Sequence, residues 1–339
     1  MRTRWEAPSA RARGLGTHLL PDATMAAVAA APDLSTVVTL LEAAGIAIPV
    51  EGGRTVQAVE LGIQRAAGSE LRRLARWVGN QAAAAAVLFD EEDRRSLRAM
   101  IRGAVAGAPA DTRLAGLIPT PPLPERELAE LARQPRVSDI AALLVAWNHP
   151  LGSVLLPAAA GLEPDLLHLE LEVDRWFARR ARAAARRGGG AFRRYVEQTI
   201  DLDNARAALL LAASGSELPA GDFFLPGGRH LSRTAFLDAA AAGSLVTAAR
   251  QLAVPLAAQG VGELMIRHAG DVARLDWALL RARVRALRLE ARRDPLGAAP
   301  VLAYVLRLRA QVVALRRCLW GMELDLPQAG RAAALEDVA

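Results

Sequence analysis

Apolar residues recur at positions i, i+3 and i+4 in three stretches of the chain that otherwise carry many polar side chains. The three matching sets are Leu97, Met100 and Ile101; Ala205, Ala208 and Leu209; and Leu315, Cys318 and Leu319. This spacing predicts one inward-facing stripe on each of three α-helices. An arginine follows the first apolar residue of each set, at Arg98, Arg206 and Arg316, and is expected on the border of the stripe.

A second apolar pattern repeats in step with the first one. Six positions within residues 25–41 match six within 128–144 and, more loosely, six within 236–252. The interval from Arg98 to Arg206 is nearly equal to the interval from Arg206 to Arg316. We therefore predict three copies of one helical unit, at residues 1–97, 98–205 and 206–323, with a C-terminal tail at residues 324–339.

Period-two alternation with β-branched enrichment is nearly absent, so the fold is predicted to be all-α. Helices are expected to begin near Ala10 after a disordered start, and to span about 56–78, 166–187 and 263–293. The proline-rich connector at 118–124 should be extended and exposed, because proline removes backbone donors.

One stretch, residues 140–162, contains no Asp, Glu or Arg and has to be weighed as a membrane span. The sequence Asn148-His149-Pro150-Leu151-Gly152 interrupts it, and Pro157 follows. These breakers favour a buried helix, turn and helix over a span.

The composition gives the chain a net positive charge, and the reason for that charge is not decided by the sequence. The 339 residues are 52% hydrophobic, with a formal charge of +6 and a pI near 10.8, which raises nucleic acid or an acidic membrane surface as partners. Every basic residue is arginine and none is lysine, which is more typical of coding preference than of a selected basic patch. The single cysteine, Cys318, fits a reducing compartment, and the first eight residues lack the apolar run of a secretory signal.

The sequence contains none of the motifs that we sought for catalytic, cofactor-binding or metal-binding sites. The five histidines do not stand at metal-ligand spacing, and the sequence has no HExxH or CxxC motif. Acidic pairs such as Glu91-Glu92 fit helix caps or solvated helix starts better than acid–base catalysis. Gly227-Gly228 lacks the Lys-Ser/Thr of a phosphate loop, and there is no GxSxG elbow. The sequence predicts no catalytic, cofactor-binding or metal-binding residue.

Arginine runs such as Arg186-Arg187 and the series Arg281, Arg283 and Arg285 are compatible with nucleic-acid binding. Aromatic residues make up only 4% of the chain and are not interleaved with these runs, as a base-stacking platform requires. A solvated or protein-facing helix surface is favoured. The alternative function, a basic α-helical repeat protein that binds nucleic acid or acts as a scaffold, stays open.

Three motifs, in this order, carry a resemblance to a known family. They are Asp201-Leu202-Asp203-Asn204-Ala205-Arg206, Leu225-Pro226-Gly227-Gly228 and Asp294-Pro295-Leu296-Gly297. Together with the opening segment at 10–20 and the threefold repeat, they make the chain resemble the C subunit of bacterial and archaeal V/A-type ATPases (ATP synthases), the counterpart of the d subunit of the eukaryotic vacuolar ATPase. The last helix departs from the polar pattern of the family, keeping only Leu315 and Arg316.

The resemblance implies a funnel of three pseudo-threefold-related helical repeats. Such a protein is a non-catalytic central-stalk adapter that seats on the membrane rotor ring, receives the central shaft in its cavity and transmits torque for ion transport or ATP synthesis. It requires no cofactor and no nucleic acid, and it lies at the cytoplasmic face of the membrane, associated only through the complex. Arg98, Arg206 and Arg316 are the candidate partner contacts, with an ion pair to a neighbouring carboxylate as an equally open alternative.

Overall fold

Six long helices form the frame of the protein. The computed structural model describes residues 5–49, 55–161, 165–214 and 218–333, and within these ranges every regular element is an α-helix or a 3-10 helix, which confirms the predicted all-α fold. The long helices, of 22 to 25 residues each, are α4 (Val56–Trp77), α5 (Ala82–Val105), α10 (Leu166–Gly188), α11 (Gly190–Ser214), α15 (Val272–Arg293) and α16 (Ala299–Glu323).

Shorter helices lie between the long ones. Those before α4 are α1 (Glu6–Leu15), η1 (Gly16–His18), α2 (Asp22–Ala30) and α3 (Leu34–Ala43), and η2 (Gly79–Gln81) precedes α5. Those between α5 and α10 are α6 (Ala110–Leu114), α7 (Glu125–Ala132), α8 (Val137–Ala146) and α9 (Gly152–Ala158). Those after α11 are η3 (Ala220–Phe223), α12 (Arg233–Ala240), α13 (Leu245–Leu256), η4 (Ala257–Gln259), α14 (Gly262–Arg267) and, after α16, α17 (Gln328–Ala333).

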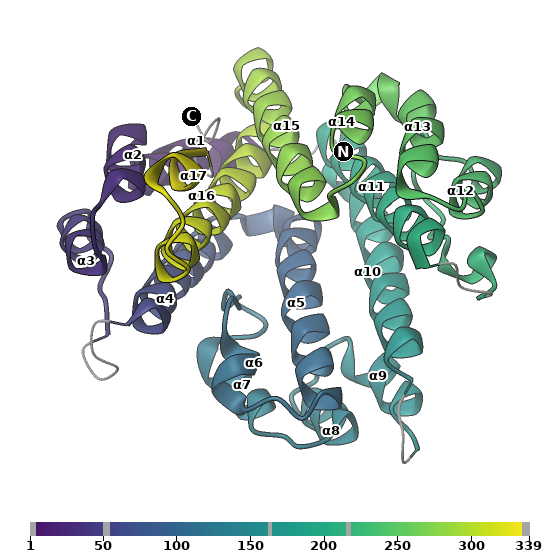
Figure 1. Ribbon diagram of the computed structural model, residues 1–339, viewed down its shortest axis with the longest axis horizontal. Helices are drawn as coiled ribbons and strands as arrows, with labels where there is room; N and C mark the ends of the chain where they lie inside the picture. The colour runs from purple at the N-terminus through teal and green to yellow at the C-terminus, as the bar shows by residue number, and fades with distance from the viewer. Residues whose placement is uncertain (1–4, 50–54, 162–164, 215–217, 334–339) are drawn as a thin grey trace.

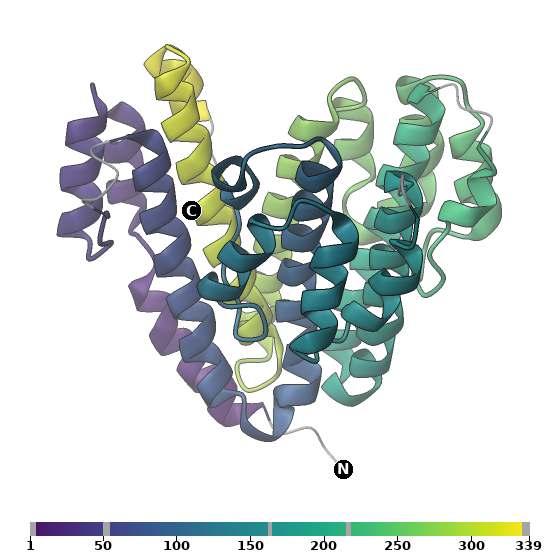
Figure 2. The same cartoon turned by 90° about the horizontal axis from the view of Figure 1, so that it is seen from below.

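The helices gather around a central region and taper toward one end. Figure 1 shows α1–α4 with α16 and α17 on one side, α5–α10 on a second and α11–α14 on a third, with α15 packed on α16. In Figure 2 the long helices converge toward the end at which α1 begins, and they spread apart at the opposite end. We call these the narrow end and the wide end. The turns from α4 to α5, from α10 to α11 and from α15 to α16 lie at the narrow end.

Helix α1 holds these turns together. The Trp5 indole donates to the Gly188 carbonyl at 3.0 Å, at the turn from α10 to α11, and its ring stacks on Phe192 with the centroids 5.0 Å apart. The Arg13 guanidinium donates to the Pro295 carbonyl at 2.7 Å, at the turn from α15 to α16. The prediction that residues 1–9 are disordered and that a helix begins near Ala10 was wrong for residues 6–9, which belong to α1. Residues 1–4 lie outside the described part of the chain.

The predicted apolar stripes are buried as expected. All nine of their positions on α5, α11 and α16 have relative exposures of 1% or less: Leu97, Met100, Ile101, Ala205, Ala208, Leu209, Leu315, Cys318 and Leu319. The three bordering arginines are only partly covered, with 28%, 53% and 36% of the side chain exposed at Arg98, Arg206 and Arg316. The helical period of 3.6 residues thus correctly predicted which positions are buried and which lie at the border of the buried stripe.

The proline-rich connector at residues 118–124 was predicted to be extended and exposed, and both parts were wrong. The chain bends at residues 121–123, where the Thr120 N–H donates to the Leu123 carbonyl at 3.1 Å, and much of the connector is buried. Ile118, Thr120 and Leu123 are buried, and the Thr120 hydroxyl donates to the Asp93 carboxylate of α5. The connector is partly covered because Ile118 and Leu123 belong to the hydrophobic core. Asp93 on α5 thus accepts a hydrogen bond from Thr120, the one residue of the connector that has a side-chain hydroxyl group.

The same helix position anchors a loop on α11 and on α16. Asp201 stands as far before Arg206 as Asp93 stands before Arg98, and it accepts the backbone N–H groups of residues 229–231, at 2.9 to 3.1 Å. Gln311 holds the equivalent place before Arg316, and its Oε1 accepts the N–H of Leu20 at 2.8 Å. The shared anchors favour the prediction of three related units.

Two of the motifs that carry the family resemblance bind each other. The Asn204 side chain exchanges two hydrogen bonds with the backbone of Leu225, both of 2.8 Å. A Cβ atom at Gly228 would lie 2.0 Å from Oδ1 of Asp201, and Gly227 has a φ of +120°. The loop can therefore approach the acidic stretch on α11 only because glycine stands at these two positions, where a larger residue would clash or be strained.

The predicted unit boundaries fall at different places relative to the helices. The boundaries at 97/98 and 205/206 lie inside α5 and α11, whereas the one at 323/324 coincides with the end of α16. Within the predicted tail, α17 packs on α2, and the Arg331 guanidinium donates to the Ala31 carbonyl at 3.0 Å. The residues after 333 lie outside the described part of the chain.

The apolar stretch from residue 140 is a helix, a turn and a helix, as predicted. It forms most of α8 and all of α9, with Ile140, Leu144, Leu151 and Leu155 fully buried between them. Asn148 turns the chain with a φ of +56°. No helix in the described ranges is both long enough and apolar enough to cross a bilayer.

Candidate functional site

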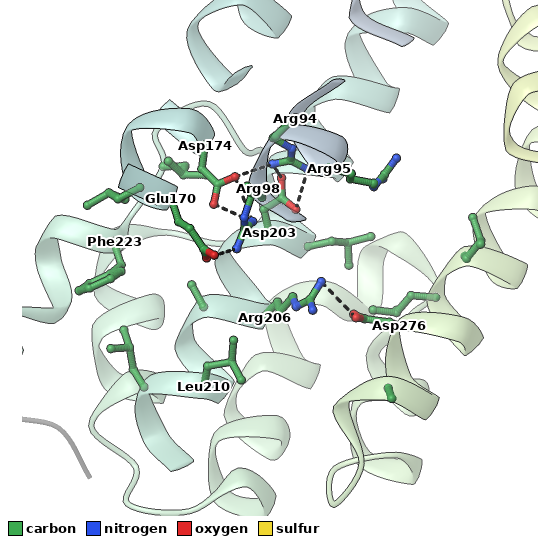
Figure 3. Close-up of a pocket in the computed structure, with 18 of the residues that line it drawn as sticks. Arg94, Arg95, Arg98, Glu170, Asp174, Asp203, Arg206, Leu210, Phe223 and Asp276 are labelled. Atoms are coloured by element: carbon green, nitrogen blue, oxygen red, sulfur yellow. Dashed lines mark hydrogen bonds and ion pairs between the residues drawn. The ribbon is translucent and has the colours of Figure 1, made fainter. Parts of the chain in front are cut away.

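A cavity of about 660 Å³ opens at the centre of the molecule, between α5, α10, α11, α15 and α16. Two of the predicted arginines, Arg98 on α5 and Arg206 on α11, line it. The long helices supply the lining because each turns one face toward the centre. The lining residues on that face are spaced four apart, as in Arg94, Arg98 and Arg102 on α5 and in Arg309, Val313 and Arg317 on α16. Figure 3 shows the side chains that project into the cavity.

One wall of the cavity is a network of arginines and carboxylates. Arg98 lies 2.8 Å from Glu170 and 3.0 Å from Asp174, both on α10. Arg94, only 5% exposed, binds Asp203 of α11 at 2.7 Å and Asp174 at 3.3 Å. The network joins three helices, as the dashed lines in Figure 3 show, and leaves each guanidinium with a carboxylate partner. This wall is braced internally rather than open to a new ligand.

The protonation of this wall reflects both its burial and its pairing. Burial alone would lower the pKa of Arg94, but Asp203 and Asp174 outweigh it and raise the pKa. Burial opposes ionisation of Glu170, yet hydrogen bonds from Arg102 and Arg98 lower its pKa. Asp174 differs, because burial outweighs its arginine partners and raises its pKa. Arg94 and Glu170 therefore stay charged at neutral pH.

Arg206 is the most open of the three predicted arginines. Its guanidinium lies 3.1 Å from the Asp276 carboxylate of α15, and the two side chains are 53% and 39% exposed. Burial raises the pKa of Asp276, and Arg206 is the largest opposing charge. Figure 3 shows this pair apart from the Arg94 network, reaching across the cavity. An exposed pair of this kind costs little to break when a partner offers a better contact.

Arg316 does not line the cavity. Its guanidinium pairs with Glu60 of α4, which is 2% exposed and also accepts the Trp320 indole N–H at 3.0 Å. A Cβ atom at Gly116 would lie 2.6 Å from the guanidinium, so the side chain sits between α16, α4 and the loop after α6. From α16 the cavity receives Arg309 and Arg317 instead. Sequence analysis missed these two, although their spacing along the helix, close to two full turns, places them on one face.

Each of the three arginines makes an ion pair with a neighbouring carboxylate. Arg98 pairs with Glu170, Arg206 with Asp276 and Arg316 with Glu60. Each carboxylate is the fifth residue of a long helix, since α10 begins at 166, α15 at 272 and α4 at 56. The same contact thus recurs between α5 and α10, between α11 and α15, and between α16 and α4. Sequence analysis did not single out these carboxylates, although their common place one turn into a helix was a readable signal.

The opposite wall of the cavity is apolar and open. Leu210 is 51% exposed and Leu218 is 43% exposed, and Phe223 also lines the cavity. Figure 3 shows Leu210 and Phe223 on the side away from Arg94. Large apolar side chains that remain exposed together in a concave surface mark a place where another molecule binds. The cavity therefore combines exposed apolar side chains with a charged wall.

Among the residues that the structure describes, no group of three or more His, Cys, Asp or Glu side chains is placed to hold a metal ion. The nearest polar cluster to a catalytic set, Asp93 with His149 and Thr120, is buried beside the connector, and His149 lies 3.6 Å from Asp93. These contacts join α5 to the loops around it.

The fold and the cavity define an all-helical protein with a tapered frame and a central cavity. The chain belongs to the ATP synthase (C/AC39) subunit family, whose sequence model matches residues 8–329. The V-type ATP synthase C subunit of Thermus thermophilus is 28% identical over 253 residues, covering 74% of this chain and 73% of that protein. The A-type ATP synthase C subunit of Haloferax volcanii is 25% identical over 244 residues, covering 69% of this chain and 68% of that protein.

Proposed function

We propose that this chain is a non-catalytic central-stalk adapter of a V/A-type rotary ATPase. It couples the central shaft to the membrane rotor ring and transmits torque for ion transport or ATP synthesis. It lies at the cytoplasmic face of the membrane as a peripheral member of the complex. Family membership supports assignment to such a complex, and the central cavity supports the adapter role.

The observation that carries the proposal is the division of the cavity into two unlike walls. The braced wall of Arg94, Arg98 and Asp174 resists deformation, because several ion pairs join three helices there. The open wall around Leu210 offers apolar surface to the end of a shaft. Torque transmission requires stiffness and contact area and no reactive group, so this division fits the task.

The three predicted contact residues then take different parts. We infer that Arg206 contacts the shaft directly, because it is exposed and its pair with Asp276 is solvated. Arg98 stands on the cavity wall with 28% of its side chain exposed and contributes charge from the opposite side. Arg316 braces α16 against α4 through Glu60 and acts on the partner only through the position of α16.

Binding of the shaft tests the proposal. The change Leu210→Asp places a charge on the open wall and should weaken binding to purified shaft subunits by at least roughly tenfold, as loss of a central apolar contact does. Val254→Asp is the matched control, because Val254 is 78% exposed on α13 and does not line the cavity. Equal binding by the two variants would refute the cavity as the shaft site.

A further inference from the structure

The narrow end of the protein carries a concentration of exposed arginines. Each of the three long helices that end there has arginine in its last turn: Arg76 on α4, Arg186 and Arg187 on α10, and Arg292 and Arg293 on α15. All five are exposed. Within the described residues none of them has an ion pair with a carboxylate, in contrast to Arg98 and Arg206 in the central cavity.

Helix α1 brings these helix ends to one place and adds charge of its own. Its contacts to Gly188 and Pro295 tie it to two of the turns, and the Arg11 guanidinium lies 4.1 Å from the ring centroid of Trp77, at the end of α4. Arg11 and Arg13 are both exposed. The carboxylates of Glu6 and Asp294 are also exposed there, but the arginines outnumber them.

The placement of a basic residue at a helix C-terminus has a local explanation, since it compensates the helix dipole. That explanation applies to each helix singly and requires no convergence. Here the three ends meet on one surface, where like charges repel and destabilise the folded state. An anionic partner would remove that repulsion.

Large apolar side chains are exposed among these arginines. Trp77 is 47% exposed, Leu289 of α15 is 53% exposed, and Leu296 in the turn from α15 to α16 is 56% exposed. Tryptophan and leucine beside arginine are typical of surfaces that sit at the boundary between lipid headgroups and acyl chains. Trp77 is the one exposed tryptophan among those that the structure describes.

We propose that the narrow end binds the headgroups of anionic phospholipids, with Trp77, Leu289 and Leu296 entering the interface. The arginines supply the charge complementarity, as clusters of basic residues do at anionic membrane surfaces. A helical protein that folds to display cations on three helix ends, with apolar side chains between them, meets a flat anionic surface better than it meets the groove of a nucleic acid. This contact adds to any association through the complex, and it does not depend on the proposed role of the central cavity.

Vesicle binding by the full-length chain tests the proposal. At ~0.1 M salt the protein should sediment with vesicles of phosphatidylcholine and phosphatidylglycerol, and not with phosphatidylcholine alone; at ~1 M salt binding should be lost, because screening shortens to ~3 Å. Each arginine near such a surface contributes roughly fivefold to binding, so Arg292→Gln with Arg293→Gln should weaken it by roughly tenfold or more. Equal binding to both kinds of vesicle would overturn the proposal, as would absence of binding.

The matched control removes the same charge elsewhere. Arg250 and Arg267 are exposed on α13 and α14, which pack on the halves of α11 and α15 away from the narrow end. The pair of changes Arg250→Gln and Arg267→Gln should leave vesicle binding within roughly twofold. An equal loss in both double variants would assign the effect to net charge and overturn the proposal.

Tryptophan fluorescence supplies an independent orientation test. Anionic vesicles with brominated acyl chains should quench the protein, and Trp77→Phe should abolish most of that quenching. Binding without quenching that depends on Trp77 would overturn the proposed orientation. Binding to double-stranded DNA at ~0.1 M salt, with none to anionic vesicles, would assign the arginines to nucleic acid and refute the lipid proposal.

Discussion

Arg206 of α11 and Asp276 of α15 form an ion pair, with 3.1 Å between guanidinium nitrogen and carboxylate oxygen, across the central cavity. It has counterparts in Arg98 with Glu170 and in Arg316 with Glu60. The three pairs differ in burial, because Glu60 is almost fully covered whereas Asp276 is not. The same kind of contact is thus covered at Arg316 and Glu60 and solvated at Arg206 and Asp276.

Reversal of the Arg206 charge should weaken binding of the shaft. Arg206→Glu removes the open cation and places a carboxylate beside Asp276, so the loss should be roughly 1 kcal/mol if the contact stays solvated and roughly 2 kcal/mol or more if the shaft buries it. The measurement is the dissociation constant with purified shaft subunits from ~0.1 M to ~1 M salt, with Arg250→Glu as the control. A constant that is independent of salt and unchanged in Arg206→Glu would contradict a direct role.

Removal of Arg94 should destabilise the protein far more than removal of Arg206. Arg94→Met leaves Asp203 without its cation and Asp174 with Arg98 alone, and removal of one partner of a buried pair typically costs roughly 3 to 5 kcal/mol. Arg206→Met breaks only an exposed pair and should cost about 1 kcal/mol or less. Urea unfolding of the two variants checks the difference. Equal free energies of unfolding would show that the Arg94 network does not brace the cavity.

The Asp201 anchor should control the order of the loop at residues 225–231. Asp201→Ala leaves three backbone N–H groups without their acceptor and should cost roughly 3 kcal/mol, because each unsatisfied group costs about 1 kcal/mol or more. Hydrogen exchange of the amides of residues 229–231 should become much faster. Asp238→Ala on α12, where the side chain is exposed, is the control. Unchanged exchange in Asp201→Ala would disprove the anchor.

Glu91 should make stability depend on acid pH. Burial alone would raise the pKa of Glu91, but Arg95, Arg283 and Arg94 outweigh it and lower the pKa from 4.5 to about 2. A lowered folded-state pKa contributes stability that is present above pH 4.5 and is lost as the pH falls toward about 2.

The test compares the free energy of unfolding of the wild type with that of Glu91→Gln between pH 7 and pH 2. The advantage of the wild type should be largest at neutral pH and should shrink in that acid window, while other carboxylates affect both proteins alike. Parallel profiles for the two proteins would contradict the assignment.

Sequence reasoning succeeded where one helix decides the outcome. The buried positions Leu97, Ala208 and Leu319 followed from a period of 3.6 residues, which needs no knowledge of the neighbouring helices. It did not predict which of two adjacent arginines on α16 faces the cavity. Neighbouring residues on a helix point about 100° apart, so Arg317 faces the cavity while Arg316 faces Glu60.

Contacts between distant segments were also out of reach. The start of α1 depends on the bond from Trp5 to Gly188, which is 183 residues away in the chain. The connector at 118–124 looked exposed because proline is common in open segments, yet Asp93 of α5 receives Thr120 and holds it in the core. Periodicity carries no information about which helix will supply such a partner.

The most direct test of the adapter role is a pull-down with the full-length chain from detergent-solubilised membranes of its source cells. The wild type should recover both rotor-ring and central-shaft subunits. Leu210→Asp should selectively lose the shaft subunits, and Val254→Asp should not. Recovery of nucleic acid with neither set of subunits would contradict the adapter role and favour a basic helical repeat protein that binds nucleic acid.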